Sequence, residues 1–281
     1  MTAAPSHDAR KFADLGPVRH IWAVAAVHAD LDRLAAVHQT VWRYFRPGDR
    51  LVYLGNLIGH GPRAVDTLNT VLAFRRALIS LPGMKAEDVI YLRGAQEEMW
   101  QKLLQLQFAP NPRDVLEWMV NQGVGGTLAS YGGSADHGMA AARGGTMTLG
   151  RWTQGLRTAM QSCPGHSELF SALRRAAYTQ PPDESGAAGE GAGLLMVSGG
   201  LDPSRPFGQQ GDRFWWGGSG FARLTGPYAG YRRVVRGWDS AGGGVAADGV
   251  AVTLDAGCGR GGPLSCGIFA PDGALLEMFH A

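Results

Sequence analysis

Three short apolar runs open the chain, and each is followed by a loop and then by apolar residues at helical spacing. This repetition predicts strand–loop–helix units joined by right-handed crossovers, so the fold class is α/β with a parallel sheet. All three loops are then expected at the same edge of the sheet. The predicted strands are residues 20–27, 51–54 and 89–92, and the predicted helices are residues 31–37, 64–81 and 98–108.

The pattern changes after the third unit. Residues 110–180 predict helices separated by glycine-rich turns, and we interpret them as a helical cap inserted beside the sheet edge. Residues 1–17 predict a flexible N-terminal arm, residues 181–193 a flexible loop, and residues 18–281 a single domain that contains the cap. Further strands are predicted at 194–197, 231–236, 249–254, 266–270 and 275–279, the last three as an antiparallel meander.

Composition narrows the class of protein. The 281 residues are 45% hydrophobic and 18% charged, which is typical of a globular protein and excludes disorder. A net charge of +2 is too small to indicate a nucleic-acid or membrane surface, and no apolar run is long enough to cross a bilayer. The cysteines, Cys163, Cys258 and Cys266, form no C-x-x-C pair. This usage, without a signal peptide, predicts a cytoplasmic protein.

The loop after the second predicted strand has the form of a functional loop. Gly55, Gly59 and Gly61 allow the backbone to bend where a side chain would obstruct it, and Pro62 stiffens the exit. In an α/β sheet, binding sites are built at the C-terminal edge of such strands. The loop nevertheless lacks the carboxylates that a hydrolytic metal site needs.

Five segments at predicted strand ends occur in an informative order: residues 25–29 (AAVHA), 55–62 (GNLIGHGP), 94–97 (GAQE), 198–200 (SGG) and 237–239 (GWD). Together they resemble the motifs of the calcineurin-like metallophosphoesterase superfamily, most nearly its bacterial serine/threonine protein phosphatases and symmetrical diadenosine tetraphosphatases. Residues 118–131, 201–215 and 254–264 resemble connecting segments of the same branch. The resemblance covers residues 18–281 and implies an α/β/β/α sandwich with a helical cap insertion.

That family holds two divalent metals, which activate a water molecule for attack on phosphorus. The resemblance aligns its six metal-ligand positions with Ala26, His28, Asn56, Ala95, Ser198 and Trp238, of which His28 alone keeps a competent ligand. It aligns the general acid with Gln96, the aspartate partner of that acid with Gly59, and the phosphate-binding arginine with His60. The resemblance therefore implies a vestigial pocket with no catalytic residue, no metal and no cofactor.

Electrostatics supports this expectation. Two dications carry four positive charges, and without a bridging carboxylate that charge stays uncompensated in a cleft of low dielectric. Loss of one outer partner of a metal ligand already lowers metal affinity by about 10–100-fold. Loss of five direct ligands therefore predicts that the dinuclear centre is abolished.

The remaining candidate residues each have a structural interpretation. His28 is either a residual ligand, paired with Asp30 or Asp32, or a loop histidine; Asp30 fits the N-cap of helix 31–37. The Asn56 amide is expected to bond N–H groups of the loop. His60 is either an anion contact when protonated or a solvent-facing residue. Trp238 either fills the emptied pocket or packs at its rim against the cap.

Acidic residues elsewhere give no replacement site. Glu97 and Glu98 are expected in the first turn of a helix, where the helix dipole favours acidic side chains. Nothing in the spacing of Asp202, Asp239 and Asp255 indicates metal binding.

Two main hypotheses of function follow. The first is a pseudophosphatase that acts as a binding or regulatory module for a protein partner or a nucleotide or phosphoester ligand. The alternative is an active phosphoesterase with a mononuclear or metal-free site that uses His28, His60 and nearby aspartates. A third hypothesis is that the chain pairs with an active relative and positions its catalytic edge.

Overall fold

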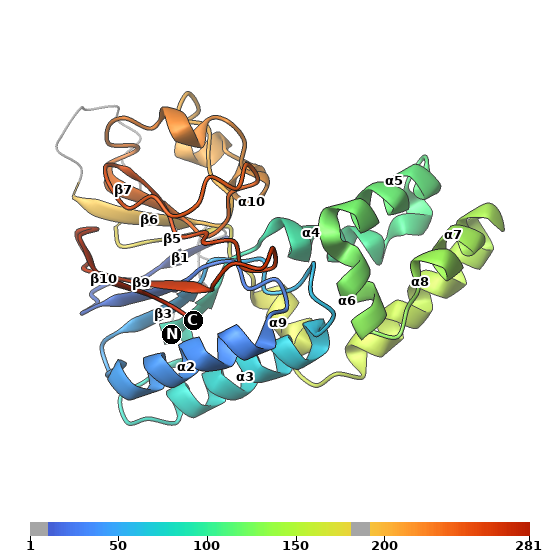
Figure 1. The fold of residues 1–281 in the computed structure, drawn as a ribbon, viewed down its shortest axis with the longest axis horizontal. Helices are drawn as coiled ribbons and strands as arrows, with labels where there is room; N and C mark the ends of the chain where they lie inside the picture. Colours follow the sequence, from blue (N-terminus) through green and yellow to red (C-terminus); the bar gives the residue numbers. More distant parts are fainter. Residues whose placement is uncertain (1–10, 181–191) are drawn as a thin grey trace, which may run out of the picture.

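The computed structural model describes residues 11–180 and 192–281. Two five-stranded sheets lie face to face, and the helices α2 and α3 cover the outer face of the first sheet (Figure 1). The first sheet has the order β10-β9-β2-β3-β4, in which β2, β3 and β4 are parallel and β9 is antiparallel to both β2 and β10. The predicted strand–loop–helix repeat is thus confirmed. The first sheet and the two helices that cover it consist of β2 (Ile21–Val24), α2 (Leu31–Tyr44), β3 (Arg50–Tyr53), α3 (Ala64–Ile79), β4 (Val89–Tyr91), β9 (Ser265–Phe269) and β10 (Leu275–His280).

The second sheet has the order β1-β5-β6-β7-β8. Within it, β1 is parallel to β5, β5 is antiparallel to β6, and β6, β7 and β8 are parallel to one another. Its strands are β1 (Phe12–Asp14), β5 (Ala176–Tyr178), β6 (Gly193–Val197), β7 (Tyr231–Arg236) and β8 (Ala251–Thr253).

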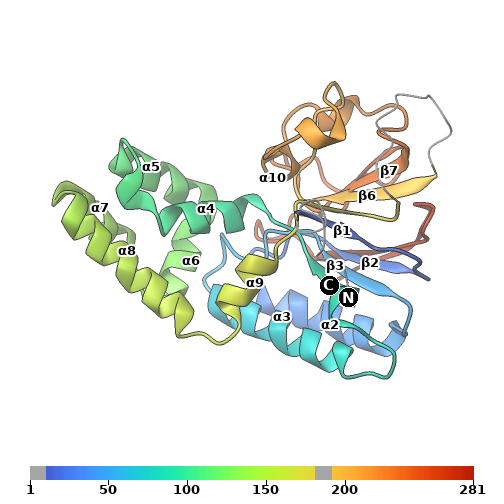
Figure 2. The same ribbon diagram turned by 180° about the vertical axis from the view of Figure 1, so that it is seen from behind.

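The helices that lie between β4 and β5 in the sequence extend away from the sandwich. α5 to α8 project to one side of it, and α9 returns the chain beside α3 (Figures 1 and 2). The longer helices of this part are α4 (Ala95–Leu103), α5 (Pro112–Met119), α6 (Gly125–Ser130), α7 (Ala135–Arg143), α8 (Thr146–Gln161) and α9 (His166–Ala172). Short turns and one further helix complete the chain: η1 (Ala86–Asp88), η2 (Leu106–Phe108), η3 (Val120–Val124), η4 (Phe207–Gln209), α10 (Arg213–Trp216) and η5 (Phe221–Arg223).

The core forms on both faces of the second sheet. Along β6, Leu194 and Met196 point into the large core shared with the first sheet, whereas Leu195 and Val197 point outward. The outward face is covered by apolar side chains from residues 201–228, which contain α10 and the short turns η4 and η5. The fourth layer of the predicted sandwich is therefore made of short helices and loops on this side. In the described part of the chain, no helix is long and apolar enough to cross a membrane.

Some predicted boundaries were wrong. Residues 12–14 of the predicted arm form β1, and Leu15 beside them is 1% exposed, because they pair with β5 far along the chain. The predicted antiparallel meander is limited to β9 and β10, since β8 joins the other sheet parallel to β7. Of the predicted loop, Gly193 belongs to β6, and residues 181–191, like residues 1–10 of the predicted arm, lie outside the described residues.

Two helix ends also differ from the prediction, for local reasons. Asp30 caps α2 as expected, its side chain accepting a hydrogen bond from the Arg33 N–H, but the helix continues to Tyr44. α4 begins at Ala95, three residues earlier than predicted, because the Glu97 carboxylate bonds the Gly94 N–H in a capping arrangement.

Candidate functional site

The nine positions singled out by the sequence analysis lie together where β2, β3, β6, β7 and α4 meet. Backbone hydrogen bonds join them: the Ala26 N–H donates to the Gly237 carbonyl, and the His28 N–H donates to the Asn56 carbonyl. Seven of the nine are buried, His60 is exposed and Trp238 is half-buried. We call this set the strand-end cluster: Ala26, His28, Asn56, Gly59, His60, Ala95, Gln96, Ser198 and Trp238.

A buried carboxylate organises the loop that follows β3. Glu97 is 0% exposed, and its Oε2 accepts hydrogen bonds from the N–H groups of Asn56 and Gly94, both at 2.8 Å. Its Oε1 accepts from Leu57 at 2.7 Å and from Ile58 at 3.3 Å. Burial raises the pKa of Glu97, and the N–H donors oppose that rise. Glu97 was predicted only as a first-turn helix residue, although the Gly-x-x-Glu spacing of a capping box was a signal for this role.

Asn56 links the second loop to the third. Its backbone is left-handed, with φ of 52°, a conformation that Asn tolerates better than most residues. Its Oδ1 accepts a hydrogen bond from the Gln96 N–H at 3.0 Å, as predicted for this amide. A Cβ at Gly94 would overlap the Asn56 backbone, so this approach of the two loops requires glycine. Asn56 Nδ2 has no hydrogen-bond partner in the described part of the chain.

Gln96 occupies the space that the aspartate at position 59 would need. A Cβ at Gly59 would overlap the Gln96 carboxamide, and the backbone of Gly59 is left-handed at φ of 91°. The Gln96 Nε2 donates a hydrogen bond to the Gln122 carbonyl of the cap at 2.7 Å. A neutral side chain at position 96 and a missing side chain at position 59 therefore fit each other sterically.

We expect Gly59→Asp to destabilise the fold by about 2–4 kcal/mol, from a left-handed backbone and an overlap with Gln96. Adding Gln96→Ala should make the double variant more stable than the sum of the single effects by about 1 kcal/mol. Urea unfolding measures both terms. Gly155→Asp is the control, because Gly155 lies exposed in α8 with open space around it; it should change stability by less than about 0.5 kcal/mol. Strict additivity would contradict the fit.

His28 and His60 form a contact at the mouth of the cluster. Their rings are edge to face, with centroids 4.7 Å apart. His28 is 2% exposed and its Nδ1 has no hydrogen-bond partner in the described part. Burial, followed by the charges of His60 and Arg260, lowers the pKa of His28 to about 3. His60 has one side of its ring covered by His28 and Gly123, and this partial desolvation, followed by the charge of Arg260, lowers its pKa although the residue as a whole is exposed. His28 is therefore a neutral interior residue and not a loop-edge histidine, whereas His60 is exposed, as one interpretation predicted.

The cap docks directly on this loop. The Gly59 N–H donates to Thr127 Oγ1 at 3.0 Å, and the His60 N–H donates to the Gly123 carbonyl at 2.8 Å. Gly123 interrupts the helix at η3 with φ of 103°, and a Cβ there would lie 2.7 Å from the His60 ring. These contacts explain the family-like segment at residues 118–131 in structural terms. Thr127 was not singled out from the sequence, because a buried hydroxyl acceptor has no local pattern.

The fourth and fifth loops close the cluster from the second sheet. The Trp238 N–H donates to the Ser198 carbonyl at 3.0 Å. Ser198 is fully buried, and its Oγ has no hydrogen-bond partner in the described part of the chain. The half-buried Trp238 packs against the main core. The neighbouring Asp239 and Asp255 are engaged by Arg236 and Arg260.

These residues do not fit the dinuclear metal centre of the family. Of the six aligned positions, Ala26, Ala95 and Trp238 offer no metal donor. The Asn56 oxygen already accepts the Gln96 N–H, and no carboxylate is placed to bridge two cations. Within residues 11–180 and 192–281, no three His, Cys, Asp or Glu side chains are grouped so as to hold a metal ion. The donor set therefore excludes the ancestral centre.

Comparison with known proteins rests on three-dimensional structure. No protein-family model matches the chain, and no curated protein matches it. The chain is similar to the crystal structure of a protein assigned as a diadenosine tetraphosphatase, at 17% identity and a TM-score of 0.53 over 97% of this chain and 98% of that one. It is also similar to a protein serine/threonine phosphatase from Saccharomyces cerevisiae with similarity to human phosphatase PP5, at 14% identity and a TM-score of 0.50 over 96% and 84%. The described part of the chain thus has the calcineurin-like metallophosphoesterase fold, as the loop motifs predicted.

Proposed function

We propose that the protein is a pseudophosphatase, a catalytically degenerate phosphoesterase-like protein that acts in the cytoplasm as a binding or regulatory module. The observation that carries this proposal is the mutual fit of the replaced residues. Gln96 fills the place of the missing side chain at Gly59 and is anchored to the cap through the Gln122 carbonyl. Packing and hydrogen bonds between groups of the chain itself thus support an arrangement of the strand-end cluster that needs no metal ligands.

The cap supplies a surface through which such a module would bind its ligand or protein partner. Trp118 on α5 is 46% exposed, and its ring centroid lies 6.0 Å from that of the half-buried Trp216 on α10. The pair joins the cap to the segment that covers the second sheet. Exposed indole rings at such a junction offer apolar area with little loss of conformational entropy, which suits a nucleobase or the apolar side chains of a protein partner.

The test is a combined metal and turnover assay. Purified protein incubated with manganese is expected to retain no stoichiometric metal after desalting. It is also expected to hydrolyse neither a phosphomonoester nor a dinucleoside tetraphosphate above the blank. Two equivalents of retained metal would overturn the proposal. So would turnover that His28→Ala removes and that His137→Ala, a change at an exposed histidine of the cap, leaves intact.

The alternative of a mononuclear or metal-free hydrolase has less support from the geometry. It needs an aspartate beside His28, but Asp30 caps α2 and pairs with Arg33. Asp32 is exposed and pairs with Arg63. Because both carboxylates are paired with arginines, neither is available to activate the His28 ring as a general base.

A further inference from the structure

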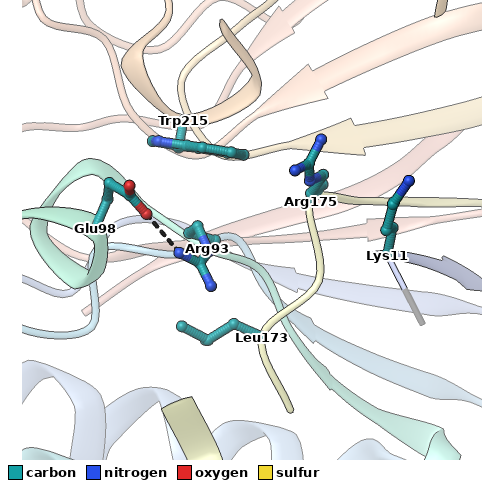
Figure 3. Close-up of a pocket in the computed structure, with 6 residues that line it drawn as sticks. All are labelled: Lys11, Arg93, Glu98, Leu173, Arg175 and Trp215. Carbon is teal, nitrogen blue, oxygen red and sulfur yellow. Dashed lines mark hydrogen bonds and ion pairs between the residues drawn. The ribbon is translucent and has the colours of Figure 1, made fainter. Parts of the chain in front are cut away.

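A cavity of about 280 Å³ lies beside the third strand-end loop, and no residue of the strand-end cluster lines it (Figure 3). It forms where β4 of the first sheet meets the β1–β5 edge of the second. There the Arg93 N–H donates to the Arg174 carbonyl at 2.7 Å, and the Arg175 N–H donates to the Lys11 carbonyl at 2.8 Å. Backbone hydrogen bonds between the two sheet edges therefore fix the residues of the cavity wall. The cavity is lined by Lys11, Arg93, Glu98, Leu173, Arg175 and Trp215.

Positive charge dominates this wall. Its three cationic side chains and one carboxylate give a net charge of +2. Glu98 pairs with Arg93, but Arg175 has no acidic partner among the described residues. Both guanidinium carbons lie 5.7 Å from the centroid of the Trp215 ring. Figure 3 shows the indole across one side of the cavity, with Arg93 and Arg175 below it.

We propose that this cavity binds a dianionic phosphate group, either free or carried by a small organic molecule. A phosphate monoester carries about −1.5 to −2 charges at neutral pH, opposite in sign to the arginines of the wall. Guanidinium groups bind such oxyanions with paired, charge-assisted hydrogen bonds, and an indole face beside them limits their hydration. The cavity volume of about 280 Å³ accommodates a phosphate with a small substituent.

The indole nitrogen of Trp215 gives no preference between the two forms of phosphate. Trp215 is 5% exposed, and its Nε1 has no hydrogen-bond acceptor in the described part of the chain. Figure 3 shows this nitrogen at the Glu98 end of the ring, away from Arg175. A buried donor without an acceptor is costly. Because this atom is closed off from solvent, it does not decide between free and organic phosphate, and the titration does.

The test is calorimetric titration of the full chain at constant ionic strength. The probes are 2-hydroxyethylphosphonate, whose C–P bond resists hydrolysis, and inorganic phosphate, with 1,3-propanediol as the uncharged control. Both anions are expected to bind and the diol is not. Tighter binding of the phosphonate identifies an organic phosphate as the ligand, and equal binding identifies free phosphate. Failure of both anions to bind, or binding of chloride with equal affinity, would overturn the proposal.

Two variants with opposite expected signs assign binding to the cavity. Arg175→Gln should weaken binding of the phosphonate at least tenfold, because it removes the guanidinium without an acidic partner. Glu98→Gln should strengthen binding severalfold, since it raises the net charge of the wall; a variant that merely damages the fold would not bind more tightly. Arg151→Gln, on the exposed face of α8, is the matched control and should bind like the unchanged protein. Equal affinities in all variants would place the anion elsewhere.

This proposal goes beyond the proposed function and fails separately from it. The probes are not substrates for hydrolysis, so activity at the strand-end cluster would leave the titration unaffected. Conversely, an inert pseudophosphatase with no affinity for phosphate would refute the cavity proposal alone.

Discussion

Replacing Glu97 with alanine is expected to destabilise the protein by about 4 kcal/mol or more, the largest effect of any single change at the strand-end loops. The carboxylate accepts four backbone N–H groups, those of Asn56, Leu57, Ile58 and Gly94. Each buried donor that loses its acceptor costs about 1–3 kcal/mol. Urea unfolding followed by far-ultraviolet circular dichroism measures the loss.

Two comparisons make this prediction specific. Glu97→Gln keeps one accepting oxygen but turns an NH₂ group toward N–H donors, so it should cost less than alanine, about 2 kcal/mol. Glu117→Ala is the matched control, because Glu117 lies exposed on α5; it should change stability by less than about 0.5 kcal/mol. If Glu97→Ala were as mild as this control, the carboxylate would not organise the loop.

Acidification is expected to destabilise the protein through His28. The pKa of His28 is lowered from 6.5 to about 3 in the folded chain. Below pH 6.5 the unfolded chain therefore binds a proton that the folded chain does not, and stability falls as the pH falls toward 3. Between pH 6.5 and 4.5 this one residue should account for a loss of about 2–3 kcal/mol.

The contribution of His28 is isolated by difference, because the buried His38 also has a pKa lowered to about 3. Urea unfolding of the unchanged protein and of His28→Asn is compared at pH 4.5 and 7.5. Asparagine is chosen since it accepts the left-handed backbone at this position, where φ is 51°. The variant should lose less stability on acidification, whereas His137→Asn, at an exposed site, should follow the unchanged protein. Identical pH slopes in all three proteins would show that His28 is protonated in the fold.

The strand-end loops are joined to one another and to the cap by buried hydrogen bonds. In a metal-dependent relative, ligands and cations would hold the loops together, whereas here buried hydrogen bonds from Glu97, Asn56 and Thr127 join the second loop to α4 and the cap. These hydrogen bonds join groups of the chain itself and do not require a bound cation. Under the proposed function, these contacts position the loops in place of metal ligands.

The sequence by itself determined the parallel half of the first sheet and the positions of the strand-end loops. Runs such as residues 51–54 are apolar because both faces of their strand are covered, so local composition reveals them. The motifs also predicted which positions lack a metal donor, because ligand chemistry depends on residue type.

Tertiary structure decided what the sequence left open. The sheet to which β1 and β8 belong is set by pairing with other strands, β5 and β7. A strand of three residues has too short a sequence pattern to reveal its pairing partner. Likewise Glu97 became the acceptor for Asn56, which is 41 residues away along the chain, and His28 became buried against His60. The burial and the hydrogen-bond partners of a residue are set by contacts between segments that are distant in sequence. The residues next to it in sequence do not reveal these contacts.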